Sequence, residues 1–261
     1  MGILNVTPDS FAEPVPRLDS AAAVDWALQM EAAGADLIDL GGESTRPGAQ
    51  PVSAREELDR ILPVLKGLSG RLRALVSVDT YKADVARAAL DAGASIVNDI
   101  SGLRYDPALA QVAAERGAGL ILMHMRGRPD TMYQEAQYDD VAADVARELR
   151  ERVALAVAAG VAIERVIVDP GIGFAKRRAD SYCVLARLAE LITAVERPVL
   201  AGPSRKSFMA DALGGRPAKE RDWGTAAAVT AAVLAGAHIV RVHAVAEMAQ
   251  VVRVAEEIRK A

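Results

Sequence analysis

Short apolar runs recur along the whole chain, and their spacing limits the possible folds more than any other feature. Each run is four to six residues long, rich in Val, Ile and Leu, and without strict polar alternation. Such runs are typical of parallel strands that are covered on both faces. We therefore expect eight parallel strands at "GILNV", "DLIDL", "ALVSV", "SIVND", "GLILM", "RVIVD", "RPVLA" and "HIVRV".

The segments between these runs are rich in Ala, Leu, Glu and Arg, and several end in a Gly just before the next run, as in "DAGASIVND" and "LAGAHIVRV". Gly is favoured after a helix because it adopts the left-handed conformation without a Cβ clash. In the segment before "DLIDL", helical spacing predicts a buried face of Val24, Leu28 and Ala32. Eight helix–strand units predict a single α/β domain over residues 1–261, a (β/α)8 TIM barrel. A doubly wound open sheet is the alternative.

Bulk properties narrow the function classes. The net charge is −4 and no basic run occurs, which argues against nucleic acid or an anionic membrane as the main partner. Cys183 is the single cysteine, so an internal disulfide is excluded, as is usual in a reducing cytoplasm. The first residues have no basic region typical of a signal peptide, and no run reaches the roughly 18 apolar residues of a membrane span. We therefore expect a cytoplasmic protein that acts on small molecules.

Polar and charged residues stand at nearly every expected strand end, where (β/α)8 barrels carry their active sites. Adjacent Asn98 and Asp99 cannot both point inward, so one of them is expected to be structural. The strand-end residues are Asn5, Asp39, Glu43, Asp79, Asn98, Asp99, His124, Asp169, Ser204, Lys206, Arg241 and His243.

Two of these stretches predict specific chemistry. "RVIVDPGIGFAK" ends a buried strand in Asp169, a carboxylate that needs a cation or a ligand as its partner. "GPSRKS" is expected to begin a helix capped by Ser204, with Arg205 and Lys206 in its first turn. Cations there oppose the helix dipole, which favours an anionic ligand over a solvated basic turn. Together with Arg46, Arg241 and His243, Lys206 predicts a site for phosphate or pyrophosphate.

In their order along the chain, eight motifs resemble those of the dihydropteroate synthase family. They are "GILNVTPDSF", "GGESTRPG", "SVDTYK", "NDISG", "LMHMRGRP", "DPGIGF", "GPSRKSF" and "RVH". The resemblance implies a (β/α)8 barrel, usually a homodimer, that joins 7,8-dihydropterin-CH2-pyrophosphate to p-aminobenzoate with Mg²⁺. The products would be 7,8-dihydropteroate and pyrophosphate, in folate biosynthesis, which makes such an enzyme a transferase and a sulfonamide target.

The resemblance also implies residue roles. Asp169, Asn98 and Asp79 match the groups that bind the pterin. Lys206 matches a lysine that contacts both the pterin and the aminobenzoate, and Ser207 lies toward the aminobenzoate carboxylate. Phe174 and Pro47 match the walls around its ring. The pyrophosphate and Mg²⁺ cluster corresponds to Asn5, Thr45, Arg46, Arg241 and His243, with Asn5 as the metal ligand. Lys206, Arg241, His243 and Asp79 would be the catalytic groups.

Three positions depart from the family pattern. The first loop reads "DSFAEPV" where "DSFSDGG" is common, "GFAK" replaces "GFGK", and "VHAV" replaces "VHDV", so that Ala244 lacks a carboxylate.

Two other functions remain open on sequence grounds. Another pterin-binding barrel, such as a methyltetrahydrofolate methyltransferase, would explain Asp79, Asn98 and Asp169 but would not need the anion cluster. A non-catalytic pterin-binding paralogue is the second.

Overall fold

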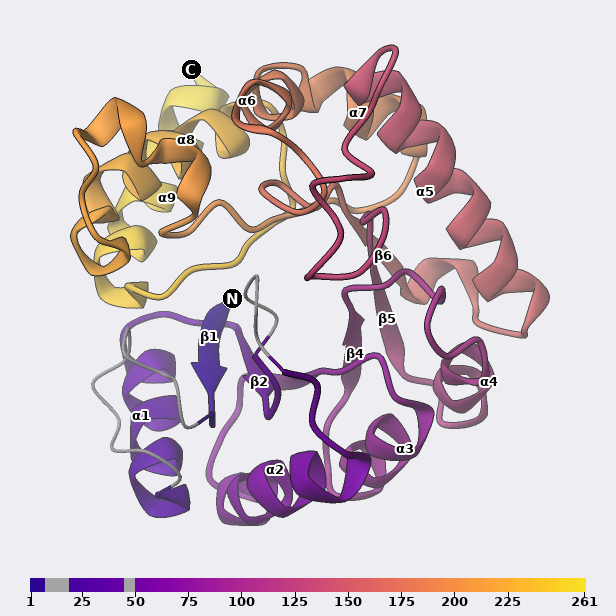
Figure 1. The fold of residues 1–261 in the computed structure, drawn as a ribbon. Coiled ribbons are helices and arrows are strands. Elements are labelled where there is room, and N and C mark those ends of the chain that lie inside the picture. The colour runs from indigo at the N-terminus through magenta and orange to yellow at the C-terminus, as the bar shows by residue number, and fades with distance from the viewer. Residues whose placement is uncertain (8–18, 45–49) are drawn as a thin grey trace.

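The computed structural model describes residues 1–7, 19–44 and 50–261. Within these ranges, parallel strands stand in the middle of the molecule and helices surround them (Figure 1). All eight expected strands form. They are β1 (Gly2–Asn5), β2 (Leu37–Gly41), β3 (Leu75–Asp79), β4 (Ile96–Asp99), β5 (Gly119–Met123), β6 (Val166–Asp169), β7 (Leu200–Ala201) and β8 (Ile239–Val240).

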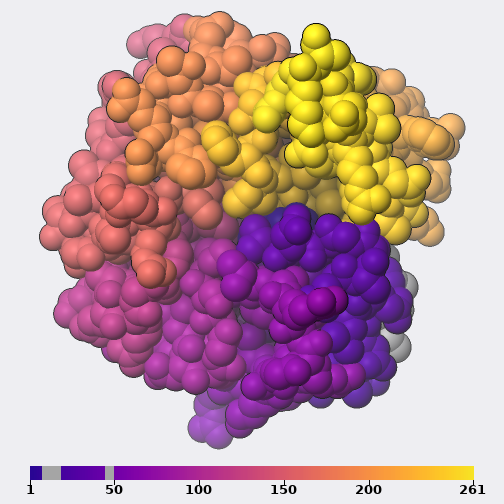
Figure 2. Space-filling view, turned by 180° about the vertical axis from the view of Figure 1, so that it is seen from behind, coloured from indigo at the N-terminus to yellow at the C-terminus, as the bar shows by residue number. Residues whose placement is uncertain are grey.

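The strands follow one another around a closed barrel. β1 to β6 pair in sequence order, and β7 pairs with β8, all in parallel. Bridges between Val168 and Val199, and between Gly2 and Val242, join these two sheets. The second bridge carries hydrogen bonds of 3.0 Å from Ile3 N to Val242 O and from Val242 N to Met1 O. The (β/α)8 barrel is therefore confirmed over the open-sheet alternative, and it places the two terminal segments side by side (Figure 2).

Helices cover the outside of the barrel. Two helices, α6 and α7, stand between β6 and β7. The helices of the described residues are α1 (Ser20–Ala32), α2 (Ala54–Leu68), α3 (Ala83–Asp91), α4 (Ala108–Glu115), α5 (Val141–Ala158), α6 (Arg178–Ala186), α7 (Leu188–Val195), α8 (Asp222–Leu234) and α9 (Val245–Lys260). None of the helices traced in residues 19–44 and 50–261 has the length and apolar character needed to cross a membrane.

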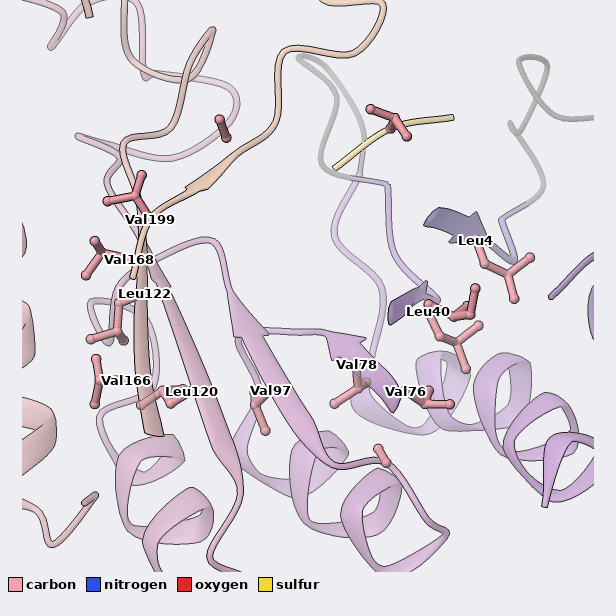
Figure 3. Close-up of a cluster of buried hydrophobic side chains, with 14 of the residues drawn as sticks. Leu4, Leu40, Val76, Val78, Val97, Leu120, Leu122, Val166, Val168 and Val199 are labelled. Atoms are coloured by element: carbon pink, nitrogen blue, oxygen red, sulfur yellow. The ribbon is translucent and has the colours of Figure 1, made fainter. Parts of the chain in front are cut away.

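Alternation along the strands separates two sets of side chains. One set faces the helices and is apolar, including Leu4, Leu40, Val78, Val97 and Leu122 (Figure 3). The other set faces the barrel interior. The interior layer nearer the amino ends of the strands is also apolar and includes Met1, Ile96, Ile121 and Leu200. The interior layer at the carboxyl ends of the strands is polar. The register aligns Asp79 with Asn98 and Met123 with Asp169, so the polar groups meet at one end of the barrel.

Most joints between helices and strands have the expected geometry. Gly34, Gly93, Gly117, Gly160 and Gly236 precede strands or their first turns with φ between 58° and 108°. The predicted face of α1 is only partly right. Val24 is buried and Leu28 is half-buried, but Ala32 is exposed. Ala23, Ala27 and Met30 complete the buried face instead, because α1 rests on β1 and β2 through a stripe shifted by one residue.

The helix predicted after β7 is wrong. Residues 207–213 form two 3₁₀ helices, Ser207–Met209 and Asp211–Leu213, and Ser204 caps neither of them. Arg205 has a φ of 57°, a left-handed value that cannot start an α-helix. The chain therefore turns sharply here, and Lys206 extends over the barrel mouth.

Candidate active site

A cavity of about 460 Å³ opens at the carboxyl ends of the strands. This size falls in the usual range for sites that enclose a small organic ligand. The structure brings seven of the predicted site residues to its wall: Asn5, Asp79, Phe174, Lys206, Ser207, Arg241 and His243. Their convergence from β1, β3, β8 and the loops after β6 and β7 confirms the expected mouth of the barrel.

Arg241 extends from the end of β8 to two buried carboxylates. Its Nε donates to Asp39 Oδ2 at 2.5 Å and its Nη2 donates to Asp79 Oδ2 at 2.8 Å. The two carboxylates raise the pKa of Arg241 against the opposing effect of burial. Burial and the nearby charge of Asp39 raise the pKa of Asp79 to about 8. One guanidinium thus compensates two acids, and a proton on Asp79 is the remaining way to reduce their repulsion.

Asn98 and Asp169 lie deeper, and both are buried. Asn98 Nδ2 donates to Asp39 Oδ2 at 3.0 Å. Asp169 Oδ1 accepts the backbone N–H of Gly171 at 2.7 Å. Burial raises the pKa of Asp169, opposed first by the charge of Lys206. Of the two partners that the sequence left open, a cation is near, and the Asp169 carboxylate and the Asn98 amide still face the barrel interior, where a ligand would bind.

Lys206 and Phe174 form a pair on one side of the cavity. The Lys206 ammonium lies 4.5 Å above the centre of the Phe174 ring and donates to the Ile172 carbonyl at 2.5 Å. Burial lowers the pKa of Lys206 to about 8, and the charge of Asp169 opposes this effect. The pair offers a cation and an aromatic face together, which suits a flat, anionic ring compound.

His243 is oriented by Ser204. Ser204 Oγ accepts the backbone N–H of His243 at 3.2 Å and lies 2.9 Å from its Nδ1. The Ser204 hydroxyl can donate to Nδ1 or accept from it, and either hydrogen bond fixes the orientation of the imidazole ring. Ser204 therefore acts as a support for His243 and not as a helix cap.

Arg205 does not need the anionic ligand that the sequence predicted for it. Its Nε and Nη2 donate to the two carboxylate oxygens of Asp222 at 2.7 Å and 2.8 Å. This bidentate pair holds the turn after β7 against the start of α8. The predicted basic turn thus places both Arg205 and Lys206 at the cavity wall, and the Arg205 guanidinium there is paired with Asp222.

Just after β2, the chain is held in place by an ion pair between Glu43 and Lys82. Glu43 accepts hydrogen bonds from Tyr81 and from Lys82, and Lys82 also donates to Glu57 at 2.5 Å. The predicted site residues Thr45, Arg46 and Pro47 lie outside the described residues, as does the first loop from residue 8 to residue 18. Among the residues that are described, no three His, Cys, Asp or Glu side chains are grouped to hold a metal ion.

Some site residues were missed by sequence reasoning, and others point elsewhere. Asp39 was recognised only as a strand-end residue, although alternation places it in the barrel interior. Met132 and Tyr133, from the loop after β5, also line the cavity. Asp99 faces outward and accepts hydrogen bonds from Ser101 and Leu103, so it is the structural member of its pair. His124 also faces outward, toward α5.

The barrel and the buried acid–amide pair beneath a cationic mouth define a pterin-binding enzyme, and residues 1–243 match the family described as pterin binding enzyme. A dihydropteroate synthase of Synechocystis is 46% identical over 258 residues, covering 99% of this chain and 89% of the relative. The chain belongs to the dihydropteroate synthase family.

Solved structures agree with this assignment. The dihydropteroate synthase of Yersinia pestis in a sulfonamide drug complex has a TM-score of 0.95 and 43% identity, covering 100% of this chain and 94% of the other. The Xanthomonas albilineans enzyme in complex with 7,8-dihydropteroate has a TM-score of 0.88 and 38% identity, covering 100% of this chain and 93% of the other.

Proposed function

We propose that this chain condenses 7,8-dihydropterin-CH2-pyrophosphate with p-aminobenzoate to give 7,8-dihydropteroate and pyrophosphate. The observation that carries the proposal is one cavity whose wall combines Asp79, the basic residues Arg241 and His243, and the Lys206–Phe174 pair, with Asp169 and Asn98 buried deeper in the barrel. Membership of the dihydropteroate synthase family supports it. The bound 7,8-dihydropteroate of the Xanthomonas albilineans enzyme supports the product.

The residues divide by the part of the substrates that they bind. Asp169 and Asn98 accept the hydrogen-bond donors on the pterin edge, and Asp79 lies beside the same ring. Arg241 and the imidazole of His243 bind the pyrophosphate. Lys206, Ser207 and the Phe174 ring bind p-aminobenzoate. On the sequence motif alone, the proposal also assigns Thr45 and Arg46 to the pyrophosphate and Pro47 to the aminobenzoate ring.

Catalysis in this proposal is electrostatic. The bond from the methylene carbon to the pyrophosphate oxygen breaks, and pyrophosphate leaves with the electron pair. Cations at the rim stabilise that charge, while the electron-rich pterin stabilises the methylene cation. The amine nitrogen of p-aminobenzoate attacks the methylene and then releases its proton to solvent or to pyrophosphate. The amine is neutral at pH 7, so positioning matters more than a general base.

A magnesium ion fits this donor set as a cofactor carried by the substrate. Mg²⁺ prefers oxygen ligands and is commonly held by one or two protein groups, phosphate oxygens and water. The amide oxygen of Asn5 is such a ligand at the cavity wall. The Glu43 carboxylate is already bound by Tyr81 and Lys82, so it is a poor candidate. When bound, the ion would neutralise charge on the leaving pyrophosphate.

Turnover with both substrates tests the proposal. We expect pyrophosphate release that requires p-aminobenzoate and a divalent cation. Release without the amine, or none with both substrates, would contradict it. Pterin binding without turnover would instead support the non-catalytic paralogue, and methyl transfer from a methylated folate would support the methyltransferase.

Two variants separate the binding roles. Asp169→Asn exchanges one acceptor oxygen for a donor, and an unpaired buried group costs about 1–3 kcal/mol. We expect a fall of about tenfold in affinity for free pterin and for its pyrophosphate ester alike. His243→Ala should weaken binding of the ester and spare free pterin. Equal losses for both ligands in His243→Ala would show a structural role for the histidine.

We also propose that the protein is a cytoplasmic homodimer. The exposed apolar side chains of Leu234, Val254 and Ile258 on α8 and α9 support self-association through these helices. Light scattering after size-exclusion chromatography tests the dimer, and a Val254→Glu/Ile258→Glu variant should shift it to monomer. Fractionation of the producing cells tests the location. A monomeric wild type, or recovery in the membrane fraction, would contradict these proposals.

A further inference from the structure

The loop after β6 has a conformation that needs external support. Gly171, Gly173 and Ala175 all have left-handed backbone angles, with φ of 66°, 83° and 47°. Ala175 is the exceptional member, because a Cβ makes this conformation unfavourable by roughly 1–2 kcal/mol. It is also completely buried. Strained residues of this kind persist only where their surroundings fix them, and they concentrate at functional sites.

Two side chains hold the back of this loop. Lys176 Nζ donates to the carbonyl of Phe174 at 3.1 Å and lies 2.9 Å from Nδ1 of His124. The Tyr138 hydroxyl donates to the carbonyl of Ala175 at 2.8 Å. Lys176 is only 1% exposed, so its ammonium is cut off from water. The backbone on both sides of the strained position is thus bonded to groups behind it.

His124 connects Lys176 to α5. Its Nδ1 accepts from the ammonium, so its Nε2 carries the hydrogen and donates to Glu148 Oε2 at 3.2 Å. Burial and the charge of Lys176 lower the pKa of His124 to about 3, which keeps the ring neutral. Glu148 is held in turn by Arg104 and Arg126. The result is a chain of hydrogen bonds from α5 to the loop.

The front of the same loop faces the active-site cavity. The Ile172 carbonyl accepts a hydrogen bond from Lys206, and the Phe174 ring lies under the Lys206 ammonium. Lys176 and Lys206 therefore bind two carbonyls of the same loop, those of Phe174 and Ile172. A shift of the Phe174 backbone would move both the ring and the cation that face the aminobenzoate position.

Stability alone does not explain a lysine at this position. Burial lowers the pKa of Lys176 to about 7, so keeping its charge at neutral pH costs free energy. The hydrogen bonds recorded for Lys176 within the described residues go to a carbonyl and a neutral imidazole, not to a carboxylate. Methionine has a similar length and would fill the same space without a charge. A residue that costs stability and fixes a cavity wall is expected where function requires the geometry.

We propose that Lys176 is a positioning residue that sets the affinity for p-aminobenzoate by fixing Phe174 and the Ile172 carbonyl. The inference rests on the proposed function, since it concerns the second substrate of that reaction. Lys176 acts through the loop and does not touch the substrate. His124 and Tyr138 are its supports on the side away from the cavity.

Lys176→Met tests this role by steady-state kinetics. We expect the KM for p-aminobenzoate to rise about tenfold, which corresponds to about 1.4 kcal/mol of lost binding. The dissociation constant of the pterin pyrophosphate should stay within about twofold of the wild type, because Asp169 keeps its own hydrogen bond to Gly171 at the start of the loop, and Asn98 and Asp79 lie on other strands. The melting temperature should be equal to or higher than that of the wild type. An unchanged KM for p-aminobenzoate would overturn the proposal.

Two further variants separate positioning from general structural damage. Tyr138→Phe removes only the hydroxyl bound to Ala175 and should raise the same KM, by a smaller factor. If Lys176→Met does not fold, the KM of Tyr138→Phe for p-aminobenzoate tests the proposal by itself, and an unchanged value would overturn it. Arg104→Met removes a charge bound to Glu148, which Arg126 still holds, and should leave both substrate constants unchanged. Parallel losses of both substrate affinities and of melting temperature in Lys176→Met would assign Lys176 a structural role. Wild-type turnover tests the proposed function separately.

Discussion

Arg241 and Asp39 are hydrogen-bonded across the interior of the barrel, with 2.5 Å between Nε and Oδ2, although they stand 202 residues apart in the sequence. Asp39 is completely buried, and the same guanidinium also binds Asp79. The centre of the site is therefore a cation between two acids, and its removal would leave the buried Asp39 carboxylate with the Asn98 amide but without a compensating charge.

Arg241→Met should lower the free energy of unfolding by about 3 kcal/mol, because removing one partner of a buried ion pair leaves an uncompensated charge. Urea denaturation at pH 7 measures the loss. The double variant Asp39→Asn/Arg241→Met is the matched control, and it should recover part of the stability. A loss below about 1 kcal/mol in the single variant would mean that water already compensates these acids.

Asp79 should make stability depend on pH in the direction opposite to that of an acid whose pKa is lowered by an ion pair in the folded state. Burial and the charge of Asp39 raise its pKa to about 8, well above the value in the unfolded chain. Between about pH 4 and pH 8 the folded state retains a proton that the unfolded state has lost, so the contribution of Asp79 falls as the pH rises. Asp79→Asn should flatten the profile. The difference between the two proteins, measured by urea denaturation at four pH values, isolates this contribution, and parallel profiles would contradict the shift.

The fold could be predicted from the sequence because helix stops and strand alternation depend on residues that are close together in the chain. Gly34 and Gly93 stop helices by backbone conformation alone, and alternation along β4 separates Asn98 from Asp99 without reference to the rest of the chain. The family motifs then predicted that Lys206 and His243 lie at the mouth of the barrel, where they line the cavity. These predictions depend on the periodic spacing of apolar residues along each helix and strand, which residues close together in the chain determine.

The remaining features depend on side-chain placement in three dimensions. No local pattern connects Asp39 with Arg241, or Arg205 with Asp222, since each pair forms only when distant elements meet. The 3₁₀ turns after β7 replaced a helix because Arg205 is held in a left-handed conformation by its pairing. Lys176 lies in the "GFAK" motif, but the sequence does not predict its burial, because a lysine after a loop usually faces water.

The structure explains one departure from the family pattern. Ala244 is the N-cap residue of α9 and offers no side-chain acceptor to the first turn. An aspartate there would accept a backbone N–H and favour the positive end of the helix dipole. Ala244→Asp should raise the free energy of unfolding by about 1 kcal/mol and leave kcat unchanged. A higher kcat without a gain in stability would instead assign the family's carboxylate to catalysis.

Lys206 should limit activity at alkaline pH. Burial lowers its pKa to about 8, so its ammonium is lost as the pH rises through that value. We expect kcat/KM for p-aminobenzoate to fall above about pH 8 in the wild type. Lys206→Arg keeps a charge that does not titrate in this range, so its profile should stay flat to higher pH, at a lower rate. The same alkaline fall in both proteins would assign it to another group.

Gly171 has no tolerated replacement at the start of the loop that carries Phe174. Its φ is 66°, and a Cβ at this position would overlap the carbonyl oxygen of His124. The obstacle is backbone, which cannot rotate away as a side chain could. Its N–H also binds Asp169, so a displaced loop would disturb the pterin acid as well. Gly171→Ala should therefore reduce kcat/KM at least a hundredfold, about 2.7 kcal/mol of transition-state stabilisation, and should lower the melting temperature. Gly215→Ala is the control: its φ of 78° carries the same backbone penalty, but nothing lies within 4 Å of the added Cβ. Similar losses in both variants would attribute the effect to backbone conformation alone and not to the contact with His124.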